Sequence, residues 1–303
     1  MKKHLIINAD DFGYCEERNK GIVECYKAGA VTSTTLMVSG QAAQQAAELI
    51  SEYNISVGLH FNITEGQPVC QSLQTSGCTF TDANGWKLGM IGFREALHSQ
   101  KVDMKEVKLE LESQLQKFQS LCGHLPHHVD GHQHVHTLDG VREVFAEVLS
   151  SHNISCTRLP VEDVNVPWLN SDWKQFFTSV VNSAVEAKDL FYQNGISSTD
   201  HFLGMTTMGS DMDSEMTEER IQSALKAIFS PDNTINKDKS SVSCELMVHP
   251  GYPNCDLQGG CGQGPDGFAK SADRLHEVQV LTSSAMQQFY KEQGIKLISF
   301  KDL

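Results

Sequence analysis

The sequence predicts an α/β fold: a distorted (β/α) barrel, similar in plan to a TIM barrel, with parallel strands inside and helices outside. Short apolar runs alternate along the whole chain with segments of helical periodicity, which is typical of a parallel sheet covered by helices. The chain has 303 residues, of which 40 % are hydrophobic, enough for one large barrel. No segment has the composition of a linker, so we expect residues 1–303 to form a single domain.

Each predicted strand is a short run that is apolar or rich in Thr and Val, and the next segment has apolar residues at helical spacing. The predicted strands are 5–8, 33–38, 56–61, 127–130, 155–159, 200–203, 244–249 and 296–300. The predicted helices are 16–28, 41–51, 93–98, 107–121, 142–149, 173–187, 221–229 and 275–293. Two longer loops, 66–87 and 251–270, follow strands, and we expect them to wall a site at the C-terminal face of the sheet.

Composition and charge exclude several classes of protein. With 38 acidic and 24 basic residues the net charge is −14, which disfavours binding to nucleic acid. No apolar run approaches the roughly 18 residues of a membrane span, and the N-terminus lacks the pattern of a signal peptide. The nine cysteines form no CxxC pair. We therefore predict a cytoplasmic protein with reduced thiols, without a nucleic-acid or membrane partner.

Histidine and aspartate cluster at three predicted strand ends, in residues 4–11, 55–60 and 127–136. Packing acidic and imidazole groups together at strand ends costs folding free energy unless another group balances their charge, and a divalent metal is the simplest such group. Asp10 and Asp11 follow a strand directly, and on extended backbone their side chains point to opposite sides, so one could bind a metal while the other faces a substrate or water. Helix capping by one of them is an equally good interpretation. His60 ends another strand at the same predicted edge of the sheet.

The third cluster is the richest, with five histidines and one aspartate in ten residues. His132, His134 and His136 would share a face on extended backbone, whereas His128 and His132 would share one on a helix. Spacing alone leaves the choice of ligand open.

Two later residues also stand at strand ends. Arg158, in Arg158-Leu159-Pro160, could pair with a carboxylate and orient it, although an ordinary surface arginine would look the same. His249, in Val248-His249-Pro250, could act as a general acid, with a purely structural histidine as the alternative of equal weight.

Together these motifs resemble those of the YdjC-like carbohydrate deacetylases, which include chitooligosaccharide deacetylases. The resemblance covers nearly the whole chain and follows the family's order of motifs. The matching segments are Asn8-Ala9-Asp10-Asp11-Phe12-Gly13, Gly29-Ala30-Val31-Thr32-Ser33-Thr34-Thr35, Gly58-Leu59-His60-Phe61, His128-Val129-Asp130-Gly131-His132-Gln133-His134-Val135-His136 and Val248-His249-Pro250. The loop at 251–267 is longer and richer in glycine than the bacterial pattern.

The resemblance implies a distorted barrel with one divalent metal held by Asp11, His60 and His132. It also implies that Asp10 is the general base. His249 and Arg158 resemble two residues of the wider polysaccharide-deacetylase group: a late histidine that acts as acid and the arginine of an Arg-x-Pro element. The expected reaction removes acetyl groups from an acetylated sugar or oligosaccharide, in oligosaccharide degradation. The family favours Mg²⁺, whereas two imidazole ligands suit Zn²⁺, Co²⁺ or Mn²⁺ better.

Two alternatives remain at this stage. A phosphoesterase on the same fold would need a second metal, for which His134 and His136 could supply ligands. A non-catalytic carbohydrate-binding protein could also keep the fold. A homodimer is a further assembly that the sequence allows.

Overall fold

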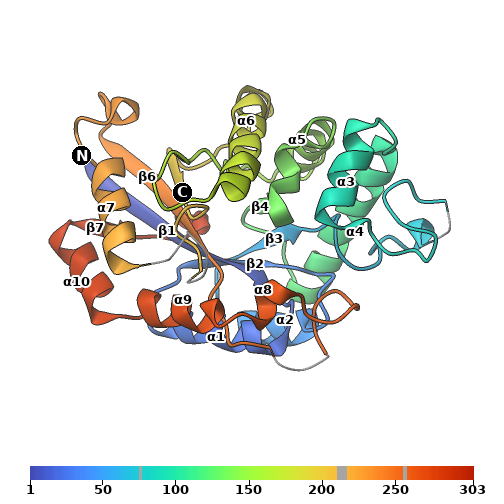
Figure 1. Ribbon diagram of the computed structural model, residues 1–303, viewed down its shortest axis with the longest axis horizontal. Coiled ribbons are helices and arrows are strands. Elements are labelled where there is room, and N and C mark those ends of the chain that lie inside the picture. The colour runs from blue at the N-terminus through green and yellow to red at the C-terminus, as the bar shows by residue number, and fades with distance from the viewer. Residues whose placement is uncertain (75–76, 210–216, 255–257) are drawn as a thin grey trace.

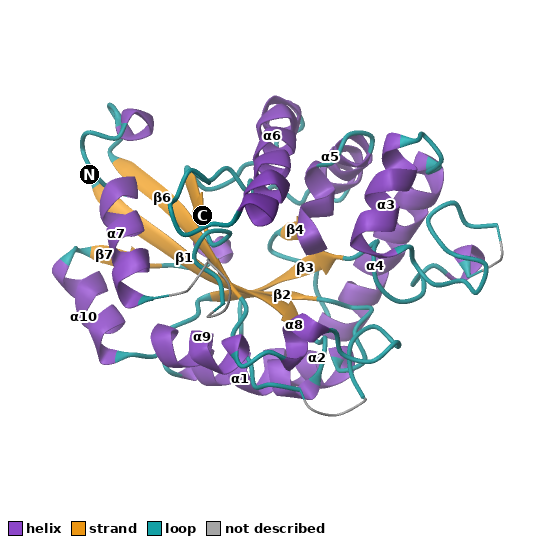
Figure 2. Cartoon of the chain, viewed as in Figure 1, coloured by secondary structure: helices purple, strands orange, loops and turns teal. Residues whose placement is uncertain are grey.

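The computed structural model describes residues 1–74, 77–209, 217–254 and 258–303. Within them a curved sheet of parallel strands crosses the molecule, and helices pack around its outside (Figures 1 and 2). The strands are β1 (Lys2–Phe12), β2 (Ser33–Leu36), β3 (Val57–Phe61), β4 (Val129–Gly131), β5 (His201–Leu203), β6 (Ser241–Val248) and β7 (Ile295–Leu297). The predicted α/β class with parallel strands inside helices is therefore confirmed.

The strand order is β4-β3-β2-β1-β6-β5, and β7 pairs with the first part of β1. Each strand of this order is followed by helices that return the chain to the start of the next strand, as parallel pairing requires. These helices are α1 (Glu16–Lys27), α2 (Ala43–Tyr53), α3 (Gly89–His98), α4 (Met104–Cys122), α5 (Val141–Ser151), α6 (Ser171–Gln193), α7 (Glu218–Ile228), α8 (Gly267–Lys270), α9 (Asp273–Leu281) and α10 (Ser284–Glu292). Among the described residues, no helix combines the length and apolar character needed to cross a membrane.

The barrel is distorted between β4 and β5. The strand predicted at 155–159 is reduced there to two isolated parallel bridges, Val129 with Thr157 and Cys156 with Ser197. The carbonyl of Arg158 accepts a hydrogen bond from Nε2 of His136 at 3.0 Å, and Pro160 has no N–H to donate. A regular ladder therefore cannot continue through this segment.

Two predictions near the C-terminus were wrong in detail. The single helix predicted at 275–293 is two helices, because the hydroxyl of Ser283 accepts from the backbone N–H of Met286 and begins α10 anew. The strand predicted at 296–300 is β7, which ends at Leu297 and gives way to a 3₁₀ turn at 300–302.

Candidate active site

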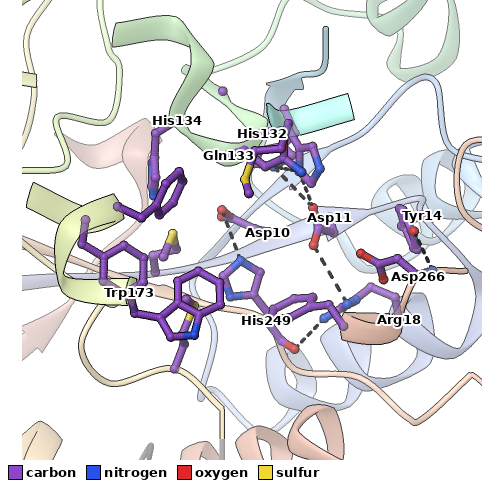
Figure 3. A pocket seen from close by; sticks show the side chains of 18 residues that line it. Asp10, Asp11, Tyr14, Arg18, His132, Gln133, His134, Trp173, His249 and Asp266 are labelled. Atoms are coloured by element: carbon purple, nitrogen blue, oxygen red, sulfur yellow. Dashed lines mark hydrogen bonds and ion pairs between the residues drawn. The ribbon is translucent and has the colours of Figure 1, made fainter. Parts of the chain in front are cut away.

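The strand ends on one edge of the sheet meet at a cavity of about 230 Å³. Asp10 and Asp11 come from β1, His132 from just after β4, and His249 from just after β6 (Figure 3). His60 comes from β3. Parallel strands place their carboxyl ends at one edge, so these five residues, from four segments far apart in sequence, converge. Of the predicted site residues, Arg158 alone does not line the cavity among the described residues.

An irregularity in β1 brings both carboxylates to the cavity. The pairing with β2 runs from Ala9↔Thr34 to Phe12↔Leu36, so β1 carries one residue more than its neighbour. Asp11 takes up that extra residue with a φ of 64°. A bulge of this kind interrupts the alternation of side chains along a strand. The expectation that the two acids point to opposite sides of an extended strand therefore fails, because both line the same cavity.

Asp11, His60 and His132 form a compact triangle of donor atoms. Oδ1 of Asp11 lies 3.4 Å from Nε2 of His60 and 3.2 Å from Nδ1 of His132, and those two nitrogens are 3.2 Å apart. Three ligands of one divalent ion, each about 2.1 Å away at octahedral or tetrahedral angles, would be about 3.0–3.4 Å apart. The triangle therefore has the size and the donor types of a three-ligand metal site.

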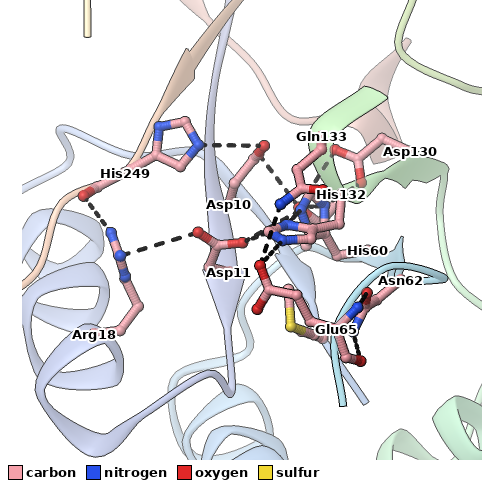
Figure 4. A network of polar contacts seen from close by, with 12 residues as sticks. Asp10, Asp11, Arg18, His60, Asn62, Glu65, Asp130, His132, Gln133 and His249 are labelled. Carbon is pink, nitrogen blue, oxygen red and sulfur yellow. Dashed lines mark hydrogen bonds and ion pairs between the residues drawn. The ribbon is translucent and has the colours of Figure 1, made fainter. Parts of the chain in front are cut away.

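A carboxylate sits behind each imidazole of this triangle (Figure 4). Nδ1 of His60 is 2.6 Å from Oδ1 of Asp130, and Nε2 of His132 is 3.0 Å from Oε1 of Glu65. Such a partner fixes which ring nitrogen carries the proton and turns the other toward a metal. Sequence reasoning assigned no role to Asp130 or Glu65, although Asp130 lies within the third cluster and Glu65 directly precedes the predicted loop 66–87.

The pKa shifts of Asp11, His60 and His132 show that the surroundings of the triangle favour positive charge. Burial would raise the pKa of Asp11, but the adjacent His132 and His60 hold it well below its usual range. Burial lowers the pKa of His60, yet Asp130, Asp10 and Asp11 outweigh it and raise the value to about 9. Burial also opposes protonation of His132, but Glu65 and Asp11 raise its pKa well above the usual value. Positive charge is thus favoured at the triangle, and a divalent cation can supply it in place of ring protons.

Arg158 neutralises a second group of carboxylates beneath the cavity. Its guanidinium is fully buried and contacts both oxygens of Asp10 at 2.6 Å, Asp130 at 3.0 Å and Glu245 at 2.7 Å. The predicted pairing of this arginine with a carboxylate is therefore present. Asp10, His60 and Asp130 form a second group whose possible ligand atoms lie close together. The guanidinium of Arg158 already pairs with the negative charges of Asp10 and Asp130 in this group. A cation is consequently better placed at the Asp11 triangle.

His249 lines the same cavity and lies beside Asp10. Its Nε2 is 3.8 Å from Oδ2 of Asp10, while its carbonyl accepts hydrogen bonds from Arg18 at 2.6 Å and Arg274 at 3.0 Å. Burial lowers the pKa of His249 to about 4, against the pull of Asp10, Asp11 and Glu277. Arg18 also reaches Oδ2 of Asp11 at 4.0 Å. The imidazole is thus held by its backbone and left neutral beside Asp10.

The remaining histidines of the third cluster have other surroundings. Residues 132–137 form a short 3₁₀ segment that is interrupted by Gln133 and His134, whose φ angles are 54° and 59°, so neither the extended nor the helical pattern applies. His134 and His136 are buried, which lowers the pKa of His134 well below its usual value and that of His136 to about 4. Neither belongs to a candidate ligand group among the described residues.

An apolar wall faces the polar floor of the cavity. It consists of aromatic residues from the first turns of α6, of methionines, and of the phenyl ring on α8: Trp173, Phe176, Phe177, Met90, Met208, Met247 and Phe268. Trp173 stacks on Phe177 with ring centroids 5.4 Å apart and is 39 % exposed. The sequence patterns gave no signal for this wall beyond the helical periodicity of 173–187.

Fold and site together define a class: an α/β protein with a candidate three-ligand metal site, a further carboxylate and a histidine at the strand ends of a parallel sheet. The YdjC-like protein family model matches residues 4–292. The chain belongs to this family, and the resemblance inferred from its motifs is confirmed.

Full-length relatives carry consistent names. The chain is 44 % identical over 310 residues to the carbohydrate deacetylase of Danio rerio, covering 99 % of this chain and 98 % of that one. It is 41 % identical to the carbohydrate deacetylase of Homo sapiens, covering 100 % and 91 %. It is 31 % identical to the chitooligosaccharide deacetylase of Proteus mirabilis, covering 100 % of both. These relatives support the predicted enzyme class.

A crystal structure shares the fold. It is that of an Enterococcus faecalis protein described as a cellobiose-phosphate cleavage protein, with a TM-score of 0.75, 22 % identity and coverage of 100 % of this chain and 99 % of that one.

Proposed function

We propose that this chain is a metal-dependent carbohydrate deacetylase, with residues 1–303 as one catalytic domain that hydrolyses N-acetyl groups of an acetylated sugar or oligosaccharide. The observation that carries the proposal is the Asp11–His60–His132 triangle, which lies beside Asp10 and His249 in one cavity. The names of the full-length relatives support the choice of carbohydrate as substrate.

Asp11, His60 and His132 are the proposed ligands of one divalent ion. A divalent ion held by these residues would lower the pKa of a bound water towards neutrality and would polarise the acyl oxygen of the substrate. Two imidazoles and one carboxylate suit Zn²⁺, Co²⁺ or Mn²⁺ better than Mg²⁺, which prefers oxygen ligands. We therefore propose one of the former three as the working metal, although the family favours Mg²⁺.

Asp10 is the proposed general base. Arg158 holds both of its oxygens, so the carboxylate is fixed in place rather than free to rotate. It takes the proton of the water whose oxygen attacks the acetyl carbon. Arg158 is a positioning residue in this scheme, because it acts through Asp10.

His249 is the proposed proton donor to the leaving amine. The neutral imidazole receives a proton across the 3.8 Å gap from Oδ2 of Asp10 and passes it to the nitrogen as the carbon–nitrogen bond breaks. The products are acetate and a free amino sugar. An amide nitrogen cannot leave as an anion, so this proton is required.

The arrangement favours a deacetylase over the phosphoesterase alternative. Two-metal phosphoesterases need ligands that clamp a pair of ions. His134 and His136 lie outside the candidate ligand groups of the described residues, and the guanidinium of Arg158 compensates Asp10 and Asp130.

The test is acetate release from di-N-acetylchitobiose by protein that has been stripped of metal and reloaded separately with Mg²⁺, Zn²⁺, Co²⁺ or Mn²⁺. We expect release that depends on one metal per chain. Metal-loaded, folded protein that releases no acetate from this or other N-acetylated sugars, yet cleaves phosphate esters, would overturn the proposal.

A further inference from the structure

The two histidines of the triangle present opposite ring nitrogens to the same point. His60 faces it with Nε2 and His132 with Nδ1, and the two atoms are 3.2 Å apart. For each ring to offer a lone pair there, its other nitrogen must carry the proton and donate it. His60 has Asp130 for this purpose, and His132 has Glu65.

The backbone around Glu65 is held firmly. Oδ1 of Asn62 accepts from the backbone N–H of Thr64 and of Glu65, each at 3.0 Å, and its Nδ2 donates to the carbonyl of Glu65 at 2.9 Å. The backbone N–H of Lys87 donates to the carbonyl of Gly66 at 2.8 Å. The buried ammonium of Lys87 donates to the carbonyl of Asn62 at 3.0 Å. The loop therefore delivers the carboxylate to His132 at a fixed place.

The two carboxylates behind the histidines differ in their surroundings. Asp130 is fully buried and shares the guanidinium of Arg158. The side chain of Glu65 is 22 % exposed and, among the described residues, its ion pair is with His132 alone. Nε2 of Gln133 donates to the same Oε1 at 3.2 Å, which ties Glu65 to the turn that carries His132 (Figure 4).

We propose that Glu65 is a positioning residue of the metal site: it accepts the Nε2–H of His132 and thereby commits Nδ1 of that ring to the metal. The inference rests on the proposed metal-dependent function. Carboxylate partners of metal-binding histidines change metal affinity by about 10- to 100-fold when removed. Glu65 is neither a ligand nor in contact with the reacting atoms, so its effect passes through the orientation of His132.

The experiment is calorimetric titration of the metal-stripped full chain with Zn²⁺. Wild type is compared with Glu65→Ala, with Glu65→Gln, and with Asp82→Asn. Asp82 is an exposed carboxylate in the loop that follows Glu65, and its Oδ1 accepts hydrogen bonds from the backbone N–H groups of Asn84 and Trp86. Thermal unfolding of each metal-free variant checks that the fold is kept.

We expect Glu65→Ala to bind Zn²⁺ about 10- to 100-fold more weakly. Glu65→Gln should recover part of this loss, because its amide oxygen can still accept the Nε2–H, and Asp82→Asn should match wild type. In ¹⁵N spectra of the Zn²⁺-loaded wild type, Nδ1 of His132 should be the metal-bound nitrogen.

Binding by Glu65→Ala as tight as that of wild type would overturn the inference, as would Glu65→Gln binding as weakly as Glu65→Ala. Coordination of Zn²⁺ through Nε2 of His132 in wild type would overturn it too. Wild-type protein that binds no Zn²⁺, Co²⁺, Mn²⁺ or Mg²⁺ would instead refute the proposed metal site itself.

Discussion

The floor and the wall of the cavity are built on different principles. The floor consists of strand-end carboxylates and imidazoles, each of which is held by at least one further charged side chain. The wall consists of aromatic and methionine side chains that pack against one another, and the guanidinium groups of Arg18, Arg94 and Arg274 lie over the rings of Phe268 and Phe176. Under the proposed function, the floor would determine which bond is broken, whereas the wall would determine which molecule is accepted. Substitutions in the two regions should therefore affect different kinetic parameters.

The largest effect is expected from Asp10→Asn on the floor. Asparagine keeps the shape but cannot take a proton, so kcat should fall by about 10²- to 10⁴-fold while metal content stays near one ion per chain. Initial rates of acetate release and metal analysis measure both quantities. Glu245→Gln removes another carboxylate from the same arginine without lining the cavity, and its loss of kcat should be much smaller. Near-normal turnover in Asp10→Asn would exclude Asp10 as the base.

His132→Ala should remove metal and activity together. Loss of a ligand should weaken Zn²⁺ binding by more than the roughly 100-fold upper value for an outer carboxylate partner. Equilibrium dialysis against Zn²⁺ measures this, and His136→Ala serves as the comparison, because that ring lies outside the candidate ligand groups of the described residues. Full metal content in His132→Ala would transfer the ligand role to another residue.

Arg158→Met tests the charge balance of the floor through stability. It leaves three buried carboxylates without their cation, which should reduce the free energy of unfolding by about 3–5 kcal/mol. Arg142→Met is a matched control, since Arg142 also pairs with three carboxylates, Asp139, Glu143 and Glu186, but these are exposed. Arg142→Met should reduce the free energy of unfolding by only about 0–1 kcal/mol for each ion pair that is lost. Equal losses in denaturant titrations of the two variants would contradict the assigned role of burial.

The smallest effect is expected from Trp173→Ala on the wall. Removing an aromatic surface of this kind should cost about 1 kcal/mol of substrate binding, which is about a five-fold rise in KM with kcat nearly unchanged. Tyr192→Ala, an exposed aromatic substitution near the other end of α6, is the control and should alter neither parameter. A fall in kcat with KM unchanged would mean that the wall takes part in the chemistry.

The strand pattern was sufficient to predict the parallel fold and the convergence of Asp10, Asp11, His60 and His249, because strand ends of a parallel sheet share one edge. The choice of His132 from the third cluster came from the family resemblance, because spacing alone left it open. The sequence did not predict the bulge at Asp11, because a bulge depends on the register against β2 rather than on local composition. Glu65 was missed for a similar reason. Its partner His132 is 67 residues away, and only the fold brings the two side chains together.

The bulge in β1 also has a consequence for engineering. It makes the presence of two acids in the cavity depend on the number of residues between Ala9 and Phe12, and not only on their identity. In a regular register only one residue would lie between Ala9 and Phe12, opposite Thr35, so the strand could carry only one of the two acids there. Anyone who transplants this centre onto another barrel must therefore copy the irregular backbone along with the side chains.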